Sequence, residues 1–344
     1  MKSLAVSART FWSSTLDWLS TDEKASWGAS FLRIVVGITL LTQLVVNFPF
    51  RSYLWGPASA WGQELHASSE FPFQRLLFGP TSDLTVMTVA YIVLGIATFA
   101  FLVGWHTRIA TLCVLVLHTW ITFSDGVYLD QSDNFVRFVL LYALFMNTSA
   151  HWSFDARRRV RAPHHKFPRT LYAAVKPYAV VVHNAALAAF TAHICMIYVA
   201  SAMFKIQGSK WQHGTATYYP LQIPHFSPFP ELSALASTNS IAIWITSYAA
   251  VYLQLFFPFM LLHATLRKVA LVGIIGMHLG IAVLMGLPFF SFLMVAGDSL
   301  FITSATYAAV DKKTREKYRK IRGRFKREPD FVPQEKTREE HVLT

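Results

Sequence analysis

The sequence predicts an all-α fold, a polytopic bundle of about eight transmembrane helices with both termini on the cytoplasmic side. Of the 344 residues, 53% are hydrophobic and 15% are charged, whereas about a quarter of the residues in a soluble domain are charged. Apolar stretches of membrane-spanning length alternate with short charged segments. The basic residues gather in segments that an eight-span arrangement places at one face of the membrane.

A helix needs roughly 20 mainly apolar residues to cross the bilayer core, and the expected spans are the segments that approach this length. Backbone groups in lipid must be paired within the protein, which favours helices over open strands. The third, fourth and seventh spans are the shortest. The spans are expected near residues 27–48, 83–104, 108–124, 135–151, 177–204, 241–263, 269–286 and 289–309.

The basic residues set the orientation. The segments after the second, fourth, sixth and eighth spans are the basic ones and would face the cytoplasm. The strongest clusters contain Arg157, Arg158, Arg159, Arg161, Lys166 and Arg169 after the fourth span, and ten basic residues between Lys312 and Arg327 after the eighth. Because these clusters adjoin apolar spans and form no domain of their own, the net charge of +12 indicates topology rather than a nucleic-acid partner.

Three regions follow from this pattern. Residues 1–26 form an N-terminal segment that reads either as an interfacial helix or as a frayed terminus, and contain no cleavable signal peptide. Residues 27–310 form the transmembrane domain, and residues 311–344 form a basic cytoplasmic tail. We expect a multi-pass protein of the cell membrane, with the lipid bilayer as its first partner.

No metal site is expected. Cys113 and Cys195 fall inside spans, where a small apolar role is the default. His183 and His193 are ten residues apart, nearly three helical turns, and each reads as a hydrogen-bonded packing histidine. The sequence also contains neither HExxH nor CxxC.

Lys205 is the first candidate for chemistry, because ionisable groups at membrane depth are costly and often functional. It ends the apolar run of residues 197–204 at the outer boundary of the fifth span and leads into a segment with Trp211 and Gly214. A desolvated lysine disfavours its ammonium form and can act as a base. An interfacial lysine that simply reaches water explains the position equally well.

Four further polar residues lie within spans. Asp298 and His278 are near the middle of the eighth and seventh spans and are expected to form a structural polar pair, the alternative being part of a proton or ligand path. Arg33, near the cytoplasmic end of the first span, is expected to snorkel or to form a structural pair. Arg137 follows Asp133 and Asn134, so a local charge pair would explain it.

Several segments, in this order, resemble those of the horizontally transferred transmembrane (HTTM) domain family, which includes vitamin K-dependent gamma-glutamyl carboxylase and sporulation-delaying protein B. The strongest is the pattern Tyr–Lys–Trp–Gly–Tyr within residues 198–219. The resemblance covers roughly residues 25–310 and is also carried by residues 31–37, 53–57, 104–108, 133–137, 151–155, 277–279 and 287–290.

The resemblance implies a catalytic role for Lys205, because the carboxylase uses a lysine in the matching segment to deprotonate a reduced quinone. A reduced quinone is therefore the expected cofactor. His278 and Asp298 are further catalytic candidates. The residues expected to bind substrate or quinol are Trp211, Gly214, Tyr218, Asn134, Arg137 and Arg33.

Two departures from the carboxylase narrow the function. Residues 122–129 contain no histidine where the carboxylase has a second catalytic one, and no large extramembrane domain follows the last span. Glutamate carboxylation is therefore not expected, and the sporulation-delaying-protein-B branch, which takes part in maturing a secreted peptide toxin, is the better match.

Three functions stay open. The first is an enzyme or enzyme subunit that modifies or matures a secreted peptide at the outer face, with the peptide or a companion maturation protein as partner. The second is a non-enzymatic scaffold or immunity partner. The third is a transporter, which ranks last because the sequence shows neither internal symmetry nor broken half-helices.

Overall fold

The computed structural model describes residues 12–59, 83–123, 130–161 and 169–325. Residues 1–11, most of the loop 49–82 and the histidine-free stretch 124–129 therefore lie outside the described residues. The chain divides into two compact units, Met1–Ser304 and Ala305–Thr344, which we treat separately. Within the described ranges every regular element is a helix, which confirms the all-α class.

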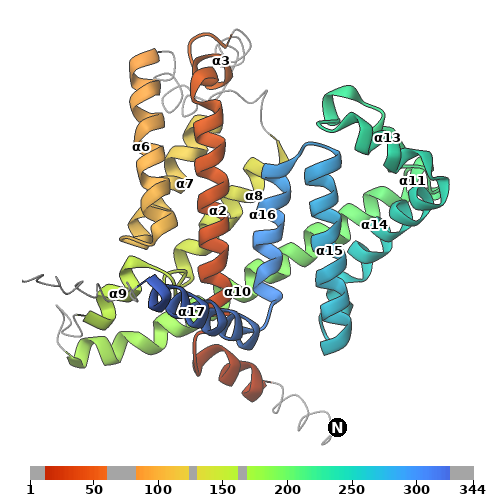
Figure 1. The fold of residues 1–344 in the computed structure, drawn as a ribbon. Helices are drawn as coiled ribbons and strands as arrows, with labels where there is room; N and C mark the ends of the chain where they lie inside the picture. The colour runs from red at the N-terminus through yellow and green to blue at the C-terminus, as the bar shows by residue number, and fades with distance from the viewer. Residues whose placement is uncertain (1–11, 60–82, 124–129, 162–168, 326–344) are drawn as a thin grey trace, which may run out of the picture. The chain divides into compact units, whose positions relative to one another are not determined.

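The elements follow one another in the order shown in Figure 1. A short helix at residues 12–20 comes first. The first unit then contains α2 (Ser26–Asn47), η1 (Phe48–Phe50), α3 (Arg51–Trp55), α6 (Leu84–Val103), α7 (Thr107–Phe123), α8 (Gln131–Phe145), α9 (Phe154–Arg161), α10 (Arg169–Ile206), α11 (Ser209–Gln212), α12 (Tyr218–Leu221), η3 (Pro224–Phe226), α13 (Pro230–Thr238), α14 (Ser240–Met260), α15 (Ala264–Leu284), α16 (Pro288–Asp298) and η4 (Ser299–Phe301). The second unit contains α17 (Ser304–Phe325), which covers the first part of the expected tail.

Five described helices are long and apolar enough to cross a membrane, and six if α16 and α17 together count as one span. The five are Ser26–Trp55, Leu84–Val103, Ala174–Ile206, Ser240–Met260 and Ala264–Leu284. Five of the eight expected spans therefore have a helix of spanning length. The total of eight, and the side on which each terminus lies, stay predictions.

Three of the expected spans differ from the structure, and one of them is α10, which begins at Arg169, eight residues before the expected limit at 177. The expected span 135–151 is α8, which has only 15 residues and begins earlier, because Asp130 and Asp133 form a capping box at its N-terminus. Met146 is extended and ends α8. The expected continuous span 289–309 is wrong, because η4 follows α16, Ile302 is extended and a new helix begins at Ser304.

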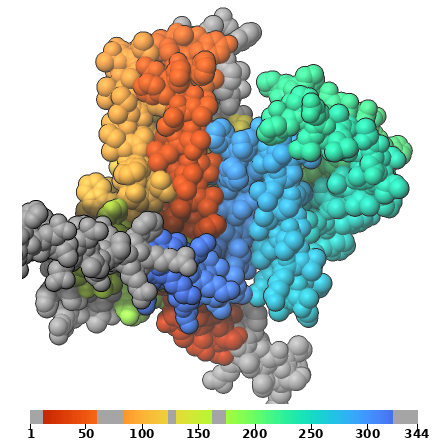
Figure 2. Space-filling model, viewed as in Figure 1, coloured from red at the N-terminus to blue at the C-terminus, as the bar shows by residue number. Residues whose placement is uncertain are grey.

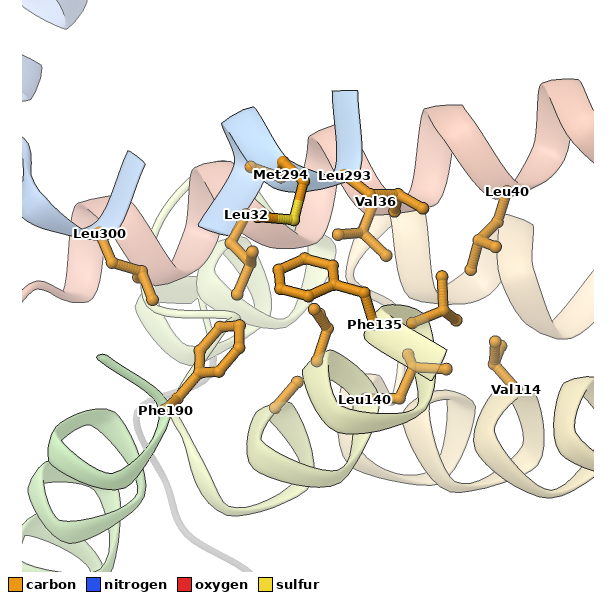
Figure 3. Packing of buried hydrophobic residues seen from close by; sticks show 14 of the residues in the cluster. Leu32, Val36, Leu40, Val114, Phe135, Leu140, Phe190, Leu293, Met294 and Leu300 are labelled. Carbon is orange, nitrogen blue, oxygen red and sulfur yellow. The ribbon is translucent and has the colours of Figure 1, made fainter. Parts of the chain in front are cut away.

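In the first unit, α2 packs against α6, α16 and α8, and the remaining long helices pack on one another in turn. Helix α2 contacts α6 and α16, α7 lies between α6 and α8, and α10 joins α8 to α14, while α15 packs between α14 and α16 (Figure 1). Figure 3 shows Leu32 and Val36 of α2 facing Met294 of α16, with Phe135 of α8 and Phe190 of α10 completing the cluster. Between helices in lipid the hydrophobic effect adds little, so this packing and the buried hydrogen bonds hold the bundle together.

His183 and Asn184 of α10 attach the N-terminal segment to the bundle. Asn184 accepts a hydrogen bond from the Lys24 backbone N–H at 2.9 Å and donates to the carbonyls of Leu19 and Asp22 at 2.9 Å each. His183 Nδ1 accepts from the Asn147 backbone N–H, and His183 Nε2 donates to the Lys24 carbonyl, both at 2.8 Å. These contacts confirm the prediction that His183 is a packing histidine.

Candidate functional site

The candidate site begins on one face of α10. Tyr198, Ser201 and Lys205 are spaced by three and four residues, so their side chains line the same side of the helix. Helix α10 packs against α14 on one side and contacts α16. The three polar side chains can therefore contact residues of α14 and α16, which come much later in the sequence.

Lys205 is held half-buried by neutral groups. Its Nζ donates to Ser201 Oγ at 2.5 Å and to Gln254 Oε1 of α14 at 2.8 Å, and it lies 5.4 Å from the centre of the Trp211 ring. Gln254 is itself buried. Across the described ranges no salt bridge includes Lys205. A lysine that is not locked into an ion pair can exchange a proton with a molecule bound beside it.

Two turns deeper on the same face, Tyr198 joins His278 and Asp298. The Tyr198 hydroxyl lies 2.8 Å from both carboxylate oxygens of Asp298 and 3.2 Å from His278 Nε2. All three side chains are buried. The expected polar pair of His278 and Asp298 is therefore a trio bridged by a tyrosine.

The hydrogen-bond directions within the trio follow from its chemistry. With Asp298 ionised, Tyr198 gives its one proton to the carboxylate and His278 Nε2 donates to the tyrosine oxygen. His278 Nδ1 then remains an acceptor, and it is buried without a hydrogen-bond partner among the described residues.

The segment after Lys205 is docked on α14. Gly214 has φ +68°, and a Cβ there would lie 2.7 Å from Trp244 and 2.8 Å from Tyr248, so only glycine fits. Tyr248 donates to the Gln212 carbonyl at 2.6 Å. Figure 2 shows the segment between α10 and α14 as a continuous surface lobe.

Tyr218 belongs to another feature of this lobe. It is exposed and lines an open cavity of about 550 Å³ together with Leu221, Pro224, Pro230, Ala234 and Thr238. Neither Lys205 nor Trp211 lines that cavity. The structure thus places Trp211 beside Lys205. Gly214 allows the loop to approach α14 closely, and Tyr218 lies apart from the lysine.

Asn134 and Arg137 form a separate group on α8. Arg137 donates to Asn134 Oδ1 at 2.9 Å and to Thr122 Oγ1 of α7 at 3.1 Å. Asp133 instead faces His118, with 3.6 Å between the carboxylate and the ring nitrogen. The hydrogen-bond partners of Arg137 include an amide and a hydroxyl, and its predicted charge pair with Asp133 stays a prediction.

Arg33 does not snorkel, which corrects that expectation. Its side chain is fully buried, donates to the Trp152 carbonyl at 2.7 Å, and lies directly beneath Gly104 in the α6–α7 turn. The charge of Asp155 acts on the guanidinium. Arg33 therefore links α2 to the α6–α7 turn and to the loop before α9. This structural role corresponds to the second alternative that the sequence offered for Arg33.

Asp155 caps α7 from outside the spans, and its ionisation should make stability depend on pH. Partial burial raises its pKa, but hydrogen bonds from the Thr107 backbone and hydroxyl and from the His106 backbone outweigh burial, and the pKa lies below its usual value. A carboxylate with a lowered pKa stabilises the fold above the unfolded value of about 3.9, and that contribution is lost as pH falls through the folded pKa.

Asp155→Asn should therefore lower the unfolding temperature of the purified protein at pH 7 by the equivalent of about 1 kcal/mol. The difference from the wild type should close below about pH 4. Thermal unfolding in detergent across this range measures both effects. Asp311→Asn, which removes an exposed ion pair with Arg315 on α17, is the control. If the difference in unfolding temperature between Asp155→Asn and the wild type were the same at every pH, the lowered pKa of Asp155 would be contradicted.

Comparison with known proteins gives one match. The model of a protein family described as the HTTM domain matches residues 22–305, most of the chain. Neither the curated proteins nor the solved structures contain a match. The matched range includes the Lys205 group, the buried trio and both arginine groups.

Proposed function

The chain belongs to the HTTM domain family, and on that premise we propose that it is an integral membrane enzyme, or the membrane subunit of one, in which Lys205 acts as the base. The observation that carries the proposal is the setting of the Lys205 amino group. Ser201 and Gln254 hold it at 2.5 and 2.8 Å, no residue that the structure describes forms a salt bridge with it, and Trp211 lies beside it.

A reduced quinone is the cofactor that we propose for this base. The residues present fit such a group, because Lys205 Nζ can take a proton from an acidic hydroxyl and the Trp211 ring offers an apolar face for a flat ring. When bound, a reduced quinone supplies reducing equivalents and an acidic hydroxyl. Gln254 and Ser201 would orient the amine, and the trio would keep the helix face behind it fixed.

The substrate class that we propose is a secreted peptide, modified or matured at the outer face of the cell membrane. The support is the resemblance to the sporulation-delaying-protein-B branch and the predicted position of Lys205 at the outer end of its span. The open cavity beside Tyr218 is lined by neither Trp211 nor Lys205, but it belongs to the segment that follows the base and gives a peptide room to lie on that segment.

Retention of a quinone tests the proposal directly. The chain, purified in mild detergent, is incubated with reduced menaquinone, passed through gel filtration and analysed by mass spectrometry. We expect about one quinone per chain, and at least a ten-fold loss in Trp211→Leu. Trp18→Leu, which changes an exposed tryptophan of the N-terminal helix, should retain the quinone.

Absence of bound quinone from the wild-type chain would overturn the quinone-linked function. If affinity purification then recovered a stoichiometric protein partner, the non-enzymatic scaffold or immunity role would replace it. Uptake of a solute by vesicles that contain only this chain would instead indicate a transporter.

A further inference from the structure

A basic surface region lies at the turn between α6 and α7, away from the Lys205 group. We call this region, formed by residues 104–109 and 154–161, the basic corner. The Asp155 backbone N–H donates to the Gly104 carbonyl at 2.9 Å, which fixes the start of α9 beside this turn. Helix α6 is one of the five helices of spanning length and ends at Val103. The turn and α9 therefore lie at the level where the bilayer meets water, whichever face that is.

The corner concentrates positive charge. Its exposed arginines are Arg108, Arg157, Arg158, Arg159 and Arg161. Within residues 104–108 and 153–161 the only carboxylate is Asp155, and it is occupied by three hydrogen bonds at the start of α7. Arg33 adds a buried positive charge beneath Gly104.

The contacts of these arginines leave most of their charge without a direct ionic partner, although Asp155 lies within electrostatic range of Arg158. Arg158 donates to His106 Nε2 at 3.3 Å, and Arg157 lies 5.6 Å from the centre of the Phe154 ring. Arg159 differs from the other arginines because it hydrogen-bonds another loop of the protein, donating to the Ser149 carbonyl and hydroxyl. In the part of the chain that the structure describes, none of the five forms a salt bridge.

Large apolar side chains stand exposed among the arginines. Trp105 is 55% exposed, Phe154 53% and Val160 82%, and Ile109 follows on the first turns of α7 at 64%. Tryptophan and arginine side by side at the end of a spanning helix are typical of the headgroup region, where rings enter the lipid and cations meet phosphate.

We propose that this corner, formed by residues 104–109 and 154–161, binds the headgroup of an anionic phospholipid. Arg157, Arg158 and Arg161 would contact the phosphate and the negative headgroup, while Trp105 and Phe154 enter the boundary of the acyl chains. The exposed apolar side chains favour a lipid over free phosphate, because a soluble anion would leave them in water.

The test compares lipids with identical acyl chains. The purified full-length chain in detergent is titrated with phosphatidylglycerol, with phosphatidylcholine, and with inorganic phosphate at matched ionic strength. Thermal unfolding and native mass spectrometry report stabilisation and retained lipid. We expect phosphatidylglycerol alone to stabilise the protein, and the effect to weaken as salt rises.

The variant Arg157→Gln/Arg158→Gln/Arg161→Gln removes three exposed charges and keeps the Arg159 contact to Ser149. Each arginine near an anionic surface contributes roughly five-fold in affinity, so the triple variant should bind phosphatidylglycerol roughly 100-fold more weakly. The matched control is Lys313→Gln/Lys317→Gln/Lys320→Gln on the exposed face of α17, which should keep wild-type binding.

Three outcomes would overturn the proposal. One is an unchanged response to phosphatidylglycerol in the arginine variant. The second is loss of the response in the α17 control alone, which would place the lipid on that helix. The third is an equal stabilisation by inorganic phosphate, which would make the corner a site for a free anion.

Discussion

Lys205→Met should abolish the oxidation of reduced menaquinone by dissolved oxygen, the two-electron acceptor supplied in the assay, while the chain still folds and enters the membrane. Methionine keeps the length and the apolar stem of lysine but removes the amine that hydrogen-bonds Ser201 and Gln254. Loss of a positioned base commonly lowers a rate by roughly 100- to 10,000-fold. The rate is measured from the absorbance of the quinone in proteoliposomes.

The matched control for this prediction is Lys210→Met. Lys210 is exposed five residues further along and lies over the Tyr219 ring at 4.6 Å, away from Ser201 and Gln254, so its removal should change the rate less than two-fold. Quinone retention should survive in Lys205→Met, because Trp211 is unchanged. Full activity in Lys205→Met would remove the lysine from the mechanism even if the quinone still binds.

How far the sequence predicted the fold depends on what ends each helix. The apolar length of α2, α6, α14 and α15 is visible in the sequence, and each lies within about five residues of its expected limits. The limits of α8 depend on a capping box at Asp130 and on the extended backbone of Met146, which no hydropathy pattern reveals. The break after η4 is caused by the backbone conformation within a continuous apolar run. Residue composition alone therefore could not predict it.

The candidate site was predicted only in part, for a similar reason. Lys205 is conspicuous because a charge ends an apolar run, and Trp211 follows it closely. Tyr198 was missed as a site residue because a tyrosine in an apolar run reads as packing, although its distance of seven residues from Lys205 was a usable signal. Gln254 comes from a helix 49 residues later, and only the packing of α14 on α10 brings it to the lysine.

Gly104→Ala should be strongly destabilising, with a loss of about 3 kcal/mol or more of stability. Gly104 ends α6 with φ +70°, a conformation that costs alanine about 1 kcal/mol. An added Cβ would also lie 1.8 Å from Arg33 Nη1 and 2.4 Å from Ser153 Cβ. Arg33 is fully buried and cannot move aside without breaking its bond to the Trp152 carbonyl.

Gly276→Ala provides the comparison. Gly276 lies inside α15, and an added Cβ would meet no atom within 4 Å, so this change should raise stability by about 0.5–1 kcal/mol. Thermal unfolding of both variants in the same detergent, together with their yield in the membrane fraction, measures the contrast. Similar behaviour of the two variants would show that the turn tolerates a side chain.

A double-mutant cycle separates the two causes of the Gly104→Ala effect. In an Arg33→Met background the guanidinium is gone, so the clash with Arg33 disappears, whereas the clash with Ser153 Cβ and the backbone part of about 1 kcal/mol remain. The coupling between the two positions is therefore expected to be positive but smaller than about 2 kcal/mol, which is the whole penalty less its backbone part. If Gly104→Ala costs the same in both backgrounds, the left-handed backbone and Ser153 are responsible, and Arg33 does not press on the turn.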